Sequence, residues 1–124
     1  MEKIYSYSFE NLDAWKEARQ IVKLTYSITL KFPNHELYGI TNQMRRAAVS
    51  ITSNISEGSG RSSKKEQAHF YQIAYSSLLE LVNQFYTSYD LNYISLEQLQ
   101  KIIMNINKVS YKINQLRKAA LINI

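Results

Sequence analysis

Residues 43–58, which read QMRRAAVSITSNISEG, constrain the fold more than any other segment of the chain. The apolar residues Met44, Ala48, Ile51 and Ile55 recur at steps of four, three and four, which places them on one face of an α-helix. Small alanine and serine side chains occupy much of the remaining circumference, so neighbouring helices can approach closely. We therefore expect a central helix around which the others pack.

A polar stripe also follows the helical repeat on this segment: Gln43, Arg46, Ser50, Asn54 and Glu57. Buried polar groups need hydrogen-bond partners, and Glu80 on a later helix is a candidate partner. We interpret the stripe with Glu80 as a structural network that fixes helix register. The alternative is a site for RNA or a peptide. Gly58 follows directly and is expected to end the helix in the left-handed conformation.

Residues that break helices are scarce, because the chain contains three glycines and one proline. This favours long helices over a sandwich or barrel. Apolar periodicity and two capping boxes predict helices over residues 12–31, 40–57, 64–89 and 96–120. Short connections between them predict one all-α domain over residues 1–124, an antiparallel up-down-up-down four-helix bundle.

Two of these helices have apolar stripes that are expected to face the core. The stripe of the first helix is Trp15, Ala18, Val22, Tyr26 and Thr29. The stripe of the last helix is Leu99, Ile102, Ile106, Val109, Ile113 and Leu116.

Positive charge is concentrated at the C-terminal end of the sequence. The net charge is +5, and residues 98–124 contain five basic residues and no acidic one. Lys101, Lys108 and Lys112 fall on one line of the last helix, and Arg117 and Lys118 follow. A basic line without acids suits contacts to a phosphate backbone, although most charged helix faces are simply solvated.

A second basic cluster, Arg61, Lys64 and Lys65, surrounds a Gly/Ser loop and the expected start of a helix. Backbone N–H groups at such a start can bind phosphate, so this cluster is a further candidate for nucleic-acid binding. An ordinary solvated loop is the alternative.

The third predicted helix is apolar over more of its circumference than an ordinary surface helix. Its flank contains Tyr71, Tyr75, Leu79 and Tyr86. A monomer of this size would leave this flank in water, so we predict that it is an interface for self-association.

The sequence offers little for catalysis. His35 and His69 stand apart, and Glu66 precedes His69 at di-iron spacing without the second motif that such a site requires. We expect no enzyme activity, no cofactor and no metal. The chain has no cysteine, no apolar run of the roughly 18 residues that span a bilayer and no secretory signal, so we expect a cytoplasmic protein without a membrane partner.

Several short motifs together resemble the small four-helix-bundle proteins encoded by intervening sequences in 23S rRNA genes. The matching residues are Phe9, Leu12, Trp15, Ala18, Phe32-Pro33, Glu36, Tyr38-Gly39, Arg45-Arg46-Ala47, Ser50, Asn54, Glu57-Gly58, Ala74, Ser77 and Glu80. The resemblance covers roughly residues 9–116. It implies a pentameric ring and a relation to the RNA-binding accessory bundles of diversity-generating retroelements.

Taken together, these features predict a non-enzymatic homo-oligomer that associates with RNA or another nucleic acid through a basic surface. The alternative is a protein-interaction scaffold whose basic surface meets an acidic protein or only aids solubility.

Overall fold

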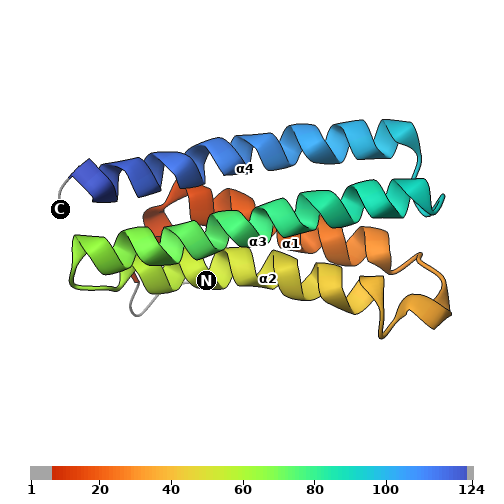
Figure 1. The fold of residues 1–124 in the computed structure, drawn as a ribbon, viewed down its shortest axis with the longest axis horizontal. Coiled ribbons are helices and arrows are strands. Elements are labelled where there is room, and N and C mark those ends of the chain that lie inside the picture. The colour runs from red at the N-terminus through yellow and green to blue at the C-terminus, as the bar shows by residue number, and fades with distance from the viewer. Residues whose placement is uncertain (1–6, 123–124) are drawn as a thin grey trace, which may run out of the picture.

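A computed structural model of the chain describes residues 7–122, which form an antiparallel four-helix bundle (Figure 1). Its helices are α1 (Asp13–Thr29), α2 (Ile40–Ser59), α3 (Lys64–Asp90) and α4 (Leu96–Ile122). The 3-10 helix η1 (Ser8–Asn11) precedes α1, and η2 (Asn34–Glu36) lies in the connection from α1 to α2. The predicted all-α, up-down-up-down bundle is thus confirmed, and every helix end lies within two residues of its expected position.

Local sequence sets the starts of the two long helices. Ser95 and Gln98 form a complete capping box, since the Gln98 N–H donates to Ser95 Oγ at 3.1 Å and the Ser95 N–H donates to Gln98 Oε1 at 2.8 Å. Ser63 accepts from the Glu66 N–H at 3.1 Å. These bonds satisfy backbone donors that have no partner inside the helix.

The core runs along the whole bundle and contains the predicted apolar faces of α2 and α4. On α2, Met44, Ala48, Ile51 and Ile55 are fully buried. On α4 the five buried members of the predicted stripe are Leu99, Ile102, Ile106, Val109 and Ile113, and Leu116 is partly buried. Phe85 of α3 is the largest fully buried side chain.

The expected inner stripe of α1 was wrong in part. The buried residues of this helix are Ala14, Ala18, Ile21, Thr25 and Thr29. Apart from Ile21 these buried side chains are small, whereas Trp15 and Val22 are only partly buried and Tyr26 is exposed. The aromatic rings of Trp15 and Tyr26 instead stack against arginine side chains, with guanidinium-to-ring distances of 4.8 and 4.7 Å.

The expected role of Gly58 was also wrong. No glycine among the described residues has a positive φ, and α2 continues through Gly58 to Ser59. A Cβ at position 58 would lie 2.9 Å from Tyr71 Cε1 and 3.0 Å from Phe70 Cβ. Glycine is therefore needed here because α3 passes so close to α2.

Within residues 7–122, no helix is both long enough and apolar enough to cross a bilayer.

Candidate nucleic-acid interface

Two basic clusters that are distant in sequence lie at the same end of the bundle. The α2–α3 connection and the end of α4 meet there (Figure 1), where Ala68, Tyr71 and Ala120 form a small buried cluster. Arg61 belongs to the α2–α3 connection, Lys64 and Lys65 begin α3, and Arg117 and Lys118 belong to the last two turns of α4. We call these five basic residues the end cluster.

Three members of the end cluster, Lys64, Lys65 and Lys118, are exposed and have no acidic partner within ion-pair distance among residues 7–122. The two arginines are held more firmly. Arg61 lies 3.6 Å from Glu57 and 4.4 Å from the centre of the Phe70 ring.

Arg117 is the other fixed arginine of the end cluster. It donates to Asn114 Oδ1 at 3.1 Å and lies 5.6 Å from the centre of the Tyr75 ring. Glu66 lies in the first turn of α3 and Glu57 pairs with Arg61, so two acidic residues lie beside the end cluster.

The predicted lysine line on α4 does not form a uniform basic surface. Lys101 forms an exposed ion pair with Glu97 at 3.4 Å, and pairs of this kind contribute little. Lys108 is exposed and has no ion-pair partner among the described residues. Lys112 is half-buried against Glu17 of α1. The expectation of three exposed lysines was therefore wrong for Lys112, because α1 supplies an acidic partner for it.

The Lys112–Glu17 ion pair joins α4 to α1. The hydrogen bond to Glu17 raises the pKa of the Lys112 ammonium, and the Coulomb attraction of Glu17 and Asp13 adds to it while desolvation opposes it. Glu17 Oε2 has almost no contact with solvent and no hydrogen bond besides this ion pair. Lys112 therefore neutralises a partly buried carboxylate, which is a structural role.

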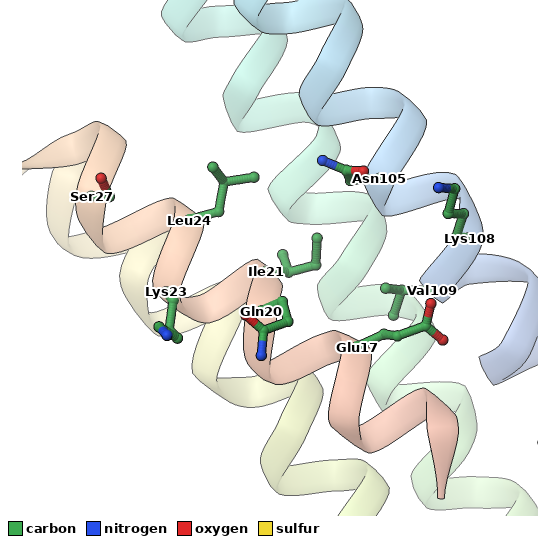
Figure 2. Close-up of a pocket in the computed structure, with 9 residues that line it drawn as sticks. All are labelled: Glu17, Gln20, Ile21, Lys23, Leu24, Ser27, Asn105, Lys108 and Val109. Carbon is green, nitrogen blue, oxygen red and sulfur yellow. The ribbon is translucent and has the colours of Figure 1, made fainter.

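A surface groove of about 570 Å³ lies between α1 and α4 (Figure 2). Leu24 and Asn105 extend into the space between the two helices, and Lys23 and Lys108 are among the residues that line it. Ile21 and Val109 form its apolar floor. No sequence pattern indicated this groove, because it depends on how far apart α1 and α4 lie.

The predicted polar network contains fewer residues than expected. Ser50 Oγ and Ser77 Oγ are 2.8 Å apart across α2 and α3, and Asn54 Nδ2 donates to Ser50 O at 2.8 Å and to Ser50 Oγ at 3.0 Å. The other predicted members are exposed on the surface: Gln43, Arg46, Glu57 and Glu80.

No ion pair joins Arg46 to Glu80 among the described residues. Glu80 instead accepts from Gln84 Nε2 at 3.3 Å. Only the middle of the stripe on α2, Ser50 and Asn54, is partly buried. Ser77, which contacts Ser50 from α3, was not among the predicted members of the network.

The four residues of the predicted interface on α3 differ in how deeply they are buried. Tyr71 is buried inside its own bundle beside Gly58 and Ala120, and this burial raises the pKa of its hydroxyl. It was therefore wrongly included in an interface between copies. Leu79 and Tyr86 are about half exposed, and Tyr75 is partly buried.

Apolar side chains of α4 extend this surface. A groove of about 480 Å³ is lined by Tyr86 and by six residues of α4, among them the apolar Leu96, Ile103 and Met104. With Leu79 and Tyr111 they form what we call the α3–α4 apolar face.

The histidines occupy separate surface positions. Both His35 and His69 are exposed, and no group of three or more His, Asp or Glu side chains within residues 7–122 could hold a metal ion.

Comparison with known proteins identifies the family. The model of the 23S rRNA-intervening sequence protein family matches residues 10–115. A similar solved structure is that of a protein of unknown function from the S23 ribosomal protein family of Bacteroides thetaiotaomicron VPI-5482. The two share 17% sequence identity and a TM-score of 0.78, over 85% of this chain and 95% of the other, a likeness that shows the fold alone. No curated protein matches. Because the family match spans most of the sequence, the chain belongs to the 23S rRNA-intervening sequence protein family.

Proposed function

We propose that this protein is a non-enzymatic, cytoplasmic accessory protein that associates with RNA through its end cluster. The observation that carries the proposal is the meeting of two basic segments at one end of the bundle, where Lys64, Lys65 and Lys118 are exposed without acidic partners among residues 7–122. Exposed lysines and arginines bind phosphate oxygens with little dependence on sequence and release condensed counterions.

The fixed arginines of the end cluster support this proposal. Arg61 and Arg117 each lie over an aromatic ring, Phe70 and Tyr75 respectively. Such stacking restrains the guanidinium groups, so less conformational entropy is lost when they bind a phosphate.

Self-association of the bundle, which we also propose, would strengthen RNA binding. In a closed oligomer the end cluster is repeated in every copy, so weak contacts add through multivalency. The α3–α4 apolar face is the proposed contact, and the resemblance to the intervening-sequence proteins nominates five subunits.

Binding of a structured RNA hairpin, followed by fluorescence anisotropy between about 50 and 200 mM salt, tests the proposal. The variant K64Q/K65Q/K118Q should weaken binding and lower the slope of log K against log salt by about 0.7–0.9 for each phosphate that is no longer neutralised. The control K16Q/K23Q/K31Q removes the same formal charge from exposed positions elsewhere. Equal losses of affinity in both variants would show that the end cluster is not the binding site.

A protein-interaction scaffold is the second candidate, and the exposed α3–α4 apolar face favours it. This function requires no RNA. Absence of RNA binding at about 50 mM salt, together with stable assembly of the purified protein, would favour the scaffold over the RNA-associated function.

A further inference from the structure

The outer face of α1 and α2 contains a second basic site, remote in sequence from the end cluster. A groove of about 490 Å³ lies there between the two helices. Its polar lining residues are Tyr26, Asn42, Arg45, Arg46, Ser50 and Ser53. The lining thus combines two arginines with amide, hydroxyl and phenol groups and contains no acidic residue, which is the composition expected of an anion site.

Arg45 is held in place from two sides. Its Nε donates to Thr29 Oγ1 at 2.9 Å, and its guanidinium carbon lies 4.7 Å from the centre of the Tyr26 ring. Thr29 is itself fixed by donating to Thr25 O at 2.7 Å. Only Nε of Arg45 has a hydrogen-bond acceptor among residues 7–122, so its two terminal nitrogens can donate to a ligand.

Arg46 adds an adjacent positive charge that no described residue neutralises. Within residues 7–122, no carboxylate lies within ion-pair distance of either Arg45 or Arg46. Arg46 is exposed, as are Asn42 and Ser53 one helical turn before and two turns after it. One guanidinium held in place, one exposed and unpaired guanidinium among the described residues, and nearby neutral donors together suit a phosphate group, whose oxygens accept several hydrogen bonds.

A second stack of arginine on an aromatic ring extends this surface along α1. The Arg19 guanidinium lies 4.8 Å from the centre of the Trp15 ring, and Trp15, Arg19 and Tyr26 fall on one stripe of the helix. Phe9 packs edge-on against Trp15, with ring centres 4.8 Å apart. Aromatic side chains alternating with basic ones are typical of surfaces that bind single-stranded nucleic acid, where phosphates meet cations and bases stack on rings.

We propose that the Arg45–Arg46 groove binds a backbone phosphate of a single-stranded nucleic acid whose strand follows the outer face of α1. This inference rests on the proposed association with RNA but assigns a separate site to it. Free phosphate offers the same oxygens, so the experiment must separate the two sources.

The test measures binding of a fluorescent decauridylate by anisotropy across a range of salt concentrations. R45Q/R46Q should weaken binding about tenfold or more and lower the salt slope by about 0.7 for each phosphate that is no longer neutralised. R45K/R46K should recover part of the affinity, because it restores the charge but not the planar fork. The control K23Q/K31Q removes two charges from exposed positions outside the groove, the end cluster and the stripe of Trp15, Arg19 and Tyr26, and it should bind nearly as the parent does.

A second variant separates binding from folding. R45Q removes a bond to buried Thr29, so its thermal midpoint must be measured. R46Q changes an exposed side chain with no ion-pair partner among the described residues. It should therefore keep the midpoint of the parent and still weaken binding several-fold. Unchanged binding by R46Q and by a folded R45Q/R46Q would overturn the inference.

The outcomes also separate this site from the end cluster. If K64Q/K65Q/K118Q lost affinity while R45Q/R46Q bound as tightly as its control, the groove would not be a binding site. The proposed function would then still stand. Loss in R45Q/R46Q alone would support the groove and refute the end cluster. Inorganic phosphate could instead bind only when both arginines are present, while decauridylate binds the parent and R45Q/R46Q equally. This result would exclude a nucleic-acid strand as the ligand of the groove.

Discussion

Gly58 shows at the scale of one residue how a missing side chain sets the distance between two helices. The edge of the Tyr71 ring and the Phe70 Cβ occupy the space that a Cβ at position 58 would need. Tyr71 is buried, so its ring cannot swing into solvent to make room. Gly60, two residues later, is different: its nearest neighbours are backbone oxygens at 3.6 and 3.9 Å from a built Cβ, and its backbone is helical with φ −90°.

We predict opposite effects for alanine at these two glycines. Gly58→Ala gains about 0.5–1 kcal/mol from helix propensity but overpacks the α2–α3 contact, which costs about 1–3 kcal/mol. The net result should be a destabilisation of about 1 kcal/mol. Gly60→Ala should be neutral or stabilising by up to about 1 kcal/mol. Urea unfolding of both variants checks this, and a Gly58→Ala protein as stable as Gly60→Ala would contradict it.

Lys112 shows what the spacing of charged residues along one helix cannot predict. On α4 alone it belongs to a basic line, and only the packing of α1 beside α4 reveals that Glu17 is its partner. A charge pattern on one helix therefore cannot distinguish a free cation from one that already neutralises an acid.

At the scale of elements, the sequence predicted helix type, ends and most buried faces, because apolar spacing and capping residues act locally. It predicted the rotation of α1 less well. Trp15 and Tyr26 are large and apolar enough to suggest the core, yet Ala14 and Thr25 occupy it. Because the apolar arc of α1 is wide, several rotations of the helix about its axis would bury apolar side chains. The side chains that favour the observed rotation lie on another helix, as Arg45 over Tyr26 does.

One hydrogen bond joins the two connections at the end of the bundle opposite the end cluster. Tyr93 Oη, in the α3–α4 connection, donates to Glu36 Oε2, in η2 before α2, at 2.7 Å. This bond raises the pKa of the Tyr93 hydroxyl, with smaller contributions from desolvation and the Glu36 charge. The folded state therefore keeps this proton to higher pH than the unfolded state does.

This linkage predicts a dependence of stability on alkaline pH. The contribution of Tyr93 should be fully present below the unfolded pKa of about 10 and should be lost as pH rises through the higher folded value. The difference in thermal midpoint between the parent and Tyr93→Phe should thus be constant near neutral pH and shrink above about 10. Tyr38→Phe, at a position that is 91% exposed, is the control and should match the parent throughout. A constant Tyr93→Phe difference across this range would contradict the assigned bond.

At the scale of the whole molecule, folding determines which side chains from separate segments form one surface. The end cluster and the Arg45–Arg46 groove each draw on two segments that are separate in the sequence, so neither could be identified from one helical stripe. The α3–α4 apolar face has the same origin. The flank of α3 predicted part of it, but Tyr71 turned inward and α4 contributed Leu96, Met104 and Tyr111.

The α3–α4 apolar face should mediate self-association, and charge placed on it should dissociate the oligomer. Leu79 and Tyr86 are 49% and 48% exposed, so Leu79→Lys with Tyr86→Lys should leave the fold intact. Burying lysines between copies costs far more than burying the original side chains. Light scattering should show the parent as an assembly, with five times the chain mass of 14.5 kDa for the pentamer that the resemblance implies, and the variant as a monomer.

Leu30→Lys with Tyr38→Lys makes the same change at exposed apolar positions near the α1–α2 connection and should leave assembly unchanged. A parent that scatters as a 14.5 kDa monomer would rule out self-association. A double-lysine variant that assembles as the parent does would place the interface elsewhere on the bundle.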